Sequence, residues 1–161
     1  MKIAMINFFF AYNYGAVLQC TALKKTLENM GHDVTIIDYR PYYQMQYYLP
    51  YPNPFLAASY AWKKLKKDFI SHRILFTAKW FVHTIFNYRY AGHRRNLKAF
   101  FQPYVEKNFC LTQRYSSYEE LVNHPPIGYD VLICGSDQLW NPDVTWGIDP
   151  AYYLNFGNHA I

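Results

Sequence analysis

The first 38 residues combine two β-branched runs with one helical pattern, and this combination limits the fold more than any other feature. Lys2 to Phe8 is a short apolar run, and Val34 to Asp38 is a second one. Between them, apolar residues recur at three- and four-residue spacing, which places them on one face of a helix. These residues are Val17, Leu18, Ala22, Leu23, Leu27 and Met30. Gly31 follows where a left-handed residue commonly ends a helix. The pattern predicts a β-α-β unit with parallel strands and a right-handed crossover.

The rest of the chain first loses and then regains periodicity. Residues 40–55 are rich in Tyr and Pro and have no clear period, which predicts a long irregular loop. Asn53 and Pro54 then form a typical helix cap and first turn. They predict helical material, with breaks, to about Asn108.

The C-terminal third returns to the alternation of strand and helix. Residues 109–112 predict a short strand, and Ser117 predicts the cap of a short helix with acidic residues in its first turn. Residues 129–134 are a buried strand by composition, and residues 152–156 predict one more strand. Because the length of 161 residues suits a single core, we expect one α/β domain over residues 1–161, with a helical insertion at about 54–108.

The cysteines and the apolar windows bear on location. Cys20, Cys110 and Cys134 are odd in number and far apart, which fits neither a disulfide framework nor a zinc site. We therefore expect reduced, buried thiols, a cytoplasmic protein, and no metal ion or cofactor. No window reaches about 18 uninterrupted apolar residues, which predicts that no segment spans a membrane.

The insertion carries most of the positive charge. Residues 61–107 contain eleven Lys or Arg and two acidic residues, whereas the remainder has five basic and nine acidic residues. A solvated helical face is the simplest explanation. Peripheral contact with an anionic membrane is the second, since four lysines lie between Trp62 and Phe69. We expect no nucleic-acid binding, because no recognised motif accompanies the charge.

Two segments follow predicted strands, where ligands bind in open parallel sheets. The first predicts substrate binding at Asn13, Tyr14, Gly15 and Gln19. A glycine at a helix N-terminus favours an anion or a polar oxygen. Helix capping by Asn13 and a tight turn at Gly15 explain the same residues equally well.

The second segment is Gly135-Ser136-Asp137-Gln138-Leu139-Trp140-Asn141-Pro142. Its polar groups and large ring suit sugar hydroxyls and a sugar face. Capping and core filling by Trp140 are the alternative, but capping explains only one or two of the four polar side chains. We therefore expect substrate binding at this segment, with Asp137 as the catalytic general base. The substrate-binding residues expected here are Gly135, Ser136, Gln138, Trp140 and Asn141.

Taken together, four segments in this order resemble the N-terminal half of polysaccharide pyruvyl transferases. They are Asn13 to Gln19, Ile37-Asp38-Tyr39-Arg40-Pro41, Gly135 to Asn141, and Tyr153-Leu154-Asn155-Phe156. The motif GSDQ-x-WN after a buried strand is the most distinctive of them, and the resemblance spans almost the whole chain.

The resemblance implies a Rossmann-like parallel-sheet domain, the N-terminal half of a two-domain glycosyltransferase-B-like architecture. It also implies transfer of a pyruvyl group from phosphoenolpyruvate to a sugar of a cell-surface polysaccharide. Family members continue into a second α/β domain that is expected to hold much of the donor site. We therefore expect this chain to be incomplete for catalysis alone, and to work with a separately encoded C-terminal half or as a homo-oligomer. Two alternatives remain, a non-catalytic carbohydrate-binding remnant and a fragment of a glycosyltransferase that uses a nucleotide sugar.

Overall fold

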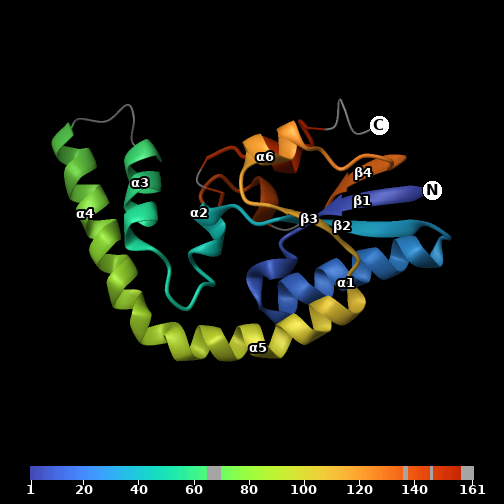
Figure 1. The fold of residues 1–161 in the computed structure, drawn as a ribbon, viewed down its shortest axis with the longest axis horizontal. Coiled ribbons are helices and arrows are strands. Elements are labelled where there is room, and N and C mark those ends of the chain that lie inside the picture. Colours follow the sequence, from blue (N-terminus) through green and yellow to red (C-terminus); the bar gives the residue numbers. More distant parts are fainter. Residues whose placement is uncertain (65–69, 136–137, 146, 157–161) are drawn as a thin grey trace.

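Four parallel strands form the single sheet of the computed structural model, which describes residues 1–64, 70–135, 138–145 and 147–156 (Figure 1). The strands are β1 (Lys2–Ile6), β2 (Asp33–Tyr39), β3 (Leu111–Tyr115) and β4 (Val131–Cys134). Their order is β3-β2-β1-β4, and every neighbouring pair is parallel. The α/β class and the Rossmann-like parallel sheet predicted from the sequence are confirmed.

The predicted β-α-β unit is present at the N-terminus. Helix α1 (Tyr14–Asn29) connects β1 to β2, and the two strands pair from Lys2 with Asp33 to Ile6 with Ile37. Gly31 ends the unit's helix as expected, with φ of 84°, because only glycine enters this left-handed region without a steric penalty. Between β1 and α1 lies η1 (Phe9–Ala11), a buried 3-10 turn.

The buried face of α1 differs from the predicted stripe. Leu18, Ala22 and Met30 are exposed, whereas Cys20 and Thr21 are buried. The reason is that a second helix, α5 (Ala91–Asn108), also packs against α1. Its Tyr104 hydroxyl donates a hydrogen bond of 3.2 Å to Thr21 Oγ1, so a polar residue that the apolar pattern omitted faces the interior.

The insertion is helical, as predicted, and extends away from the sheet. It comprises α3 (Pro54–Lys64), α4 (Ile70–Phe86), η2 (Asn87–Tyr90) and α5. Asn53 caps α3 through its Oδ1, which accepts a hydrogen bond of 2.9 Å from Phe55 N. The α3–α4 hairpin stands apart from the sheet, while α5 runs along the face that α1 covers (Figure 1). Among the described residues, no helix has the length and apolar character that crossing a bilayer requires.

Two predictions for the connecting segments are wrong. The loop predicted at 40–55 contains a one-turn helix, α2 (Tyr42–Met45). The strand predicted at 152–156 is instead the end of η4 (Pro150–Tyr153). Pro150 has no N–H for a strand ladder, and Asp149 caps the turn by accepting a hydrogen bond of 2.9 Å from Ala151 N.

Two short elements remain in the C-terminal part, α6 (Tyr118–Asn123) and η3 (Gln138–Trp140). Helix α6 lies on the face of the sheet opposite α1 (Figure 1). Ser117 caps α6 as predicted, since its Oγ accepts a hydrogen bond of 3.2 Å from Glu120 N. Strand β4 is half-buried rather than fully buried, because it pairs only with β1 among the described strands.

The three cysteines are free, but they are not all buried. Burial raises the pKa of Cys20 to about 12 and that of Cys134 to about 11, so both thiols are neutral at pH 7. Cys110 is exposed, contrary to the expectation from the sequence. The cytoplasmic location stays a prediction.

The carboxyl ends of β1 and β4 meet in a contact that leaves no room for a side chain. Gly135 N donates a hydrogen bond of 2.9 Å to Ile6 O and so extends the ladder by one residue. A Cβ added to Gly135 would lie 2.6 Å from Nδ2 of Asn7, a side chain that is only 1% exposed. A larger residue at this point therefore requires the buried Asn7 side chain to shift.

We predict that Gly135→Ala lowers the free energy of unfolding by about 1–3 kcal/mol, because the added methyl group overpacks the contact with Asn7. Urea denaturation followed by circular dichroism measures the change. Gly92→Ala is the matched control, since a Cβ there meets no atom within 4 Å. Because alanine favours a helix more than glycine does, this variant should raise the free energy of unfolding by about 0.5–1 kcal/mol. Equal effects of the two substitutions would contradict the steric explanation.

Candidate functional site

The loops that follow the four strands all emerge at one edge of the sheet, because the strands are parallel. This carboxyl edge faces α2 and the α3–α4 hairpin (Figure 1). Ligands of open parallel sheets bind at such an edge, where loops supply polar groups and the strands hold them in place. Both segments predicted from the sequence begin at this edge.

Two buried amides at the carboxyl edge have donors without an acceptor among the described residues. One is Asn7 Nδ2, which lies against Gly135, while Asn7 Oδ1 accepts a hydrogen bond of 2.6 Å from Phe8 N. The other is Gln44 Nε2 of α2; the Gln44 side chain is 3% exposed, and its Oε1 accepts a hydrogen bond of 2.7 Å from the Tyr152 hydroxyl. A donor left unpaired in the interior costs about 1–3 kcal/mol, so these groups are suited to a ligand oxygen.

Gln44 lines a cavity of about 250 Å³ that we call the β1 cavity. Phe8 and Phe10, which follow β1, form one wall, and Asp143 and Val144 form another. Asp143 and Val144 lie just beyond the predicted second segment. The cavity therefore joins the loop after β1 to the loop after β4.

The first predicted segment acts chiefly as the start of α1. Asn13 caps the helix, since its Oδ1 accepts a hydrogen bond of 2.9 Å from Ala16 N. Tyr14 is exposed and contacts Phe101 of α5 edge-to-face, with ring centroids 5.0 Å apart. Gly15 lacks a positive φ, so no tight turn requires it. Gln19 is half-buried in the second turn of α1.

The second predicted segment forms a turn that presents an aromatic ring. Asn141 closes the turn by donating a hydrogen bond of 2.6 Å to Gln138 Oε1 and accepting one of 3.0 Å from Asp143 N. Trp140 does not fill the core, because Leu139 does so instead, at 1% exposure. The indole of Trp140 is 55% exposed and is held by a hydrogen bond of 3.0 Å from Nε1 to Tyr152 O.

The exposed Trp140 ring lies beside a second aromatic ring. Its centroid is 6.5 Å from that of Tyr153, and the two planes are tilted by 34°. Adjacent aromatic faces with polar neighbours suit the apolar face of a sugar. Gly135 and Gln138 flank Ser136 and Asp137, two predicted residues that lie outside the described residues.

A larger cavity, of about 370 Å³, lies between the carboxyl ends of β2 and β3 and the hairpin. We call it the β2–β3 cavity. Tyr39 and Tyr43 line it and both donate hydrogen bonds to Asp149 Oδ2, the former over 2.8 Å. Burial, together with the nearby carboxylate, raises the pKa of both phenols well above the ordinary value, so they stay protonated. From the hairpin, Lys63 contributes the positive charge in this wall.

Tyr152 links the two cavities. Its ring contacts Phe8 at 5.3 Å and Tyr39 at 5.6 Å, both edge-to-face, and its hydroxyl bonds Gln44. Because its carbonyl also holds Trp140, one buried residue positions groups from both sides of the site.

The structure thus brings Gly135, Gln138, Trp140 and Asn141 to the carboxyl edge. It places Tyr14 and Gln19 on α1, which covers the opposite face of the sheet from α6 (Figure 1). The sequence analysis did not identify three polar residues of this edge, which are Asn7, Gln44 and Asp149. Of these, only Asn7 could have been noticed in the sequence, because it is an amide in an otherwise apolar run. Gln44 and Asp149 can be recognised as site residues only once the loops are folded.

Comparison with known proteins identifies a family for the chain. The family model described as polysaccharide pyruvyl transferase matches residues 13–159, which include both predicted segments. Neither the search of curated proteins nor that of solved structures found a match. Since the family model covers most of the chain, the chain belongs to the polysaccharide pyruvyl transferase family.

Proposed function

We propose that the chain takes part in transferring a pyruvyl group from phosphoenolpyruvate to a sugar of a cell-surface polysaccharide, and that it supplies the acceptor side of the site. Membership of the family supports the reaction class. The observation that carries the location is the pair of buried amides, Asn7 and Gln44, whose donors lack acceptors among the described residues. Buried donors are normally satisfied, so a substrate oxygen is the natural partner.

The proposed transfer defines what the site must supply. C3 of phosphoenolpyruvate gains a proton and becomes a methyl group, C2 forms bonds to two sugar oxygens, and the bond from C2 to the phosphate oxygen breaks. The two sugar hydroxyls release two protons, of which one balances the proton gained at C3 and the other leaves with phosphate. At least one hydroxyl therefore needs a general base.

We assign the role of general base to Asp137. Its position in the chain supports this, because it follows Gly135 by two residues and Gly135 is held between Ile6 and Asn7. Ser136, Gln138 and Asn141 would bind the acceptor beside it. Trp140, which is exposed next to Tyr153, would hold the apolar face of the sugar.

The donor half of the site is expected from a second α/β half, so the assay should include one. Phosphate release from phosphoenolpyruvate is measured with a panel of acceptor saccharides, using the chain alone and the chain with a C-terminal half from the family. Release in the presence of a pyruvylated saccharide product supports the proposal. Saccharide binding without release in either sample would favour the carbohydrate-binding alternative.

We predict that Asp137→Asn lowers the rate of phosphate release by about 10²–10⁴-fold, the usual contribution of a general base. Asp33→Asn is the matched control, because Asp33 is exposed at the amino end of β2, away from the carboxyl edge. Unchanged activity of Asp137→Asn would exclude Asp137 as the base, while leaving the location of the site open to other carboxylates such as Asp149.

We predict that Trp140→Ala weakens acceptor saccharide binding about tenfold, or by about 1.4 kcal/mol, since the variant loses the apolar face against which the sugar would pack. Titration calorimetry measures the change. Trp140→Phe should retain most of the affinity because it keeps a ring. Trp62→Ala, in the hairpin, should leave binding unaltered, and equal losses in the two alanine variants would argue against a sugar platform at Trp140.

Contact of residues 61–107 with an anionic membrane is a separate proposal, because a different surface carries it.

A further inference from the structure

Helix α4 turns apolar side chains toward solvent. Six of its apolar residues recur at spacings that place them on one side of the helix. They are Ile70, Ile74, Leu75, Val82, Ile85 and Phe86, all exposed, with Leu75 at 70% and Phe86 at 66%. Surface helices normally bury such a stripe against the core. In α4 the fully buried position is Thr84, whereas each of these six apolar side chains is at least 44% exposed.

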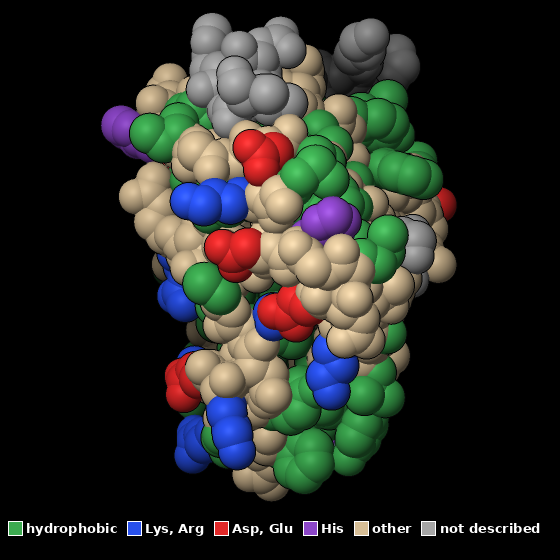
Figure 2. All heavy atoms as spheres, turned by 90° about the vertical axis from the view of Figure 1, so that its right-hand side faces the viewer, with side chains coloured by type: hydrophobic (Ala, Val, Ile, Leu, Met, Phe, Trp, Pro, Cys, Tyr) green, Lys and Arg blue, Asp and Glu red, His purple; other side chains and the backbone are tan. Residues whose placement is uncertain are grey.

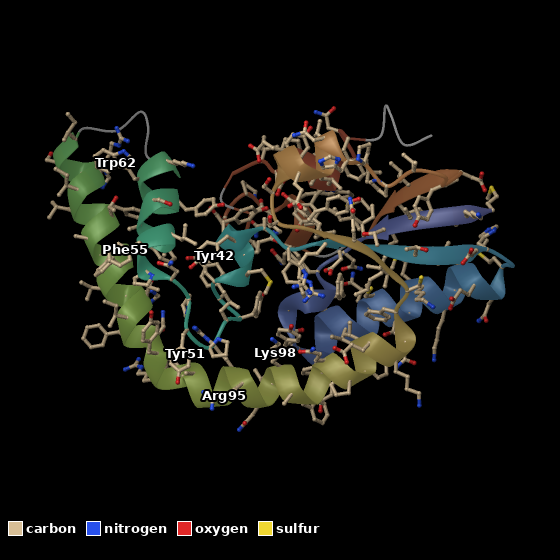
Figure 3. All side chains as sticks on the ribbon, in the orientation of Figure 1. Tyr42, Tyr51, Phe55, Trp62, Arg95 and Lys98 are labelled. Carbon is tan, nitrogen blue, oxygen red and sulfur yellow. The ribbon has the colours of Figure 1, made fainter. Side chains whose placement is uncertain are left out.

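The partner helix α3 holds α4 by its other side. The guanidinium of Arg73 lies 3.9 Å from the centroid of the Trp62 ring, and its Nη2 donates a hydrogen bond of 3.2 Å to Trp62 O. Phe55 contacts Phe81 with ring centroids 5.3 Å apart. Figure 3 shows Phe55 and Trp62 pointing from α3 toward α4. These contacts fix the orientation of α4 against α3. The six apolar side chains are therefore exposed while the two helices are packed together.

An apolar groove adds to this surface. It has a volume of about 420 Å³ and lies between the two helices. Its lining includes Trp62, Ile74, Ala78, Phe81 and Val82. A contiguous apolar surface of this kind marks a contact with a membrane or a partner rather than with water.

The described residues around the apolar surface carry charge of one sign. Between Asp68 and Glu106 the sequence contains no carboxylate side chain. Lys63, Lys79 and Arg89 are exposed on the described part of the hairpin and its end. The opposite end of the molecule differs, because acidic and basic side chains are interspersed there (Figure 2).

We propose that the α3–α4 hairpin docks on an anionic membrane surface, with the exposed side of α4 inserted at the boundary between headgroups and acyl chains. Amphipathic helices that combine Phe, Leu and Ile with Lys or Arg bind at this depth. Lys79 and Arg89 then face lipid phosphates, which supplies the charge complementarity. A second copy of the chain fits less well, because pairing two hairpins would bring like charges together.

Docking would also place a cavity at the membrane. Tyr60 and Lys63 of α3 line the β2–β3 cavity. The hairpin that carries the apolar surface therefore also forms a wall of the candidate site. A site held in this way would meet saccharides that are presented at the bilayer.

Vesicle flotation of the full chain tests the proposal. We expect the chain to float with vesicles that contain phosphatidylglycerol, and to float far less with vesicles of phosphatidylcholine alone. The variant Leu75→Glu/Phe86→Glu should lower the partition coefficient at least about tenfold, since two large side chains no longer enter the bilayer. Both positions are exposed, so the fold should be kept, and circular dichroism checks this.

Ile127→Glu is the matched control, because Ile127 is 74% exposed but lies between α6 and β4. It should float like the unaltered chain. Absence of flotation with anionic vesicles, or full flotation of the double variant, would overturn the proposal. A dimer in analytical ultracentrifugation that the double variant converts to monomer, without vesicle binding, would instead assign the surface to a second copy.

Discussion

Strand β1 forms hydrogen bonds along both of its edges, to β2 on one side and β4 on the other. Its residues from Ile3 to Ile6 are at most 2% exposed, so the register of these pairings decides which side chains face each helix layer. All pairings are parallel, and the loops after the strands therefore gather at one edge. Every functional feature assigned to the sheet depends on that arrangement.

At the carboxyl edge, buried polar groups are satisfied to different degrees. Asp149 accepts hydrogen bonds from two tyrosine hydroxyls and one backbone N–H, so it holds the C-terminal segment against β2. Hydrogen bonds to a charged group contribute about 1.5–3 kcal/mol each, which makes this a rigid support. Asn7 and Gln44, by contrast, keep donors without described acceptors. A rigid frame with a few unpaired donors is the arrangement expected where a ligand completes the hydrogen bonding.

The insertion connects this edge to a second surface. Helix α3 contributes Lys63 to the β2–β3 cavity and, through Trp62, packs against α4. The same short helix therefore serves the candidate site on one side and the apolar hairpin on the other. If the hairpin rests on lipid, the β2–β3 cavity lies near the bilayer. The proposed saccharide binding and the proposed membrane docking are then compatible with each other, although each depends on different residues.

Local pattern predicted the elements of this protein well where the chain itself supplies the cause. The β-branched runs, Gly31 and the capping residues Asn53 and Ser117 act over a few residues, and the structure has strands and helix ends at or close to the expected places. The motif GSDQ-x-WN likewise indicated the family without any coordinates.

Long-range packing decided the rest. Thr21 faces inward because Tyr104 of α5 bonds it, and Trp140 faces outward because Leu139 takes the core position. Gln44 and Asp149 meet Tyr152 and Tyr39 across more than 100 residues, a separation at which sequence pattern carries no information about contact. The sequence by itself determined most of the elements and the family, since these follow from local physics and a distinctive motif. Only the tertiary structure decided which polar groups converge at the carboxyl edge and which apolar side of α4 remains uncovered.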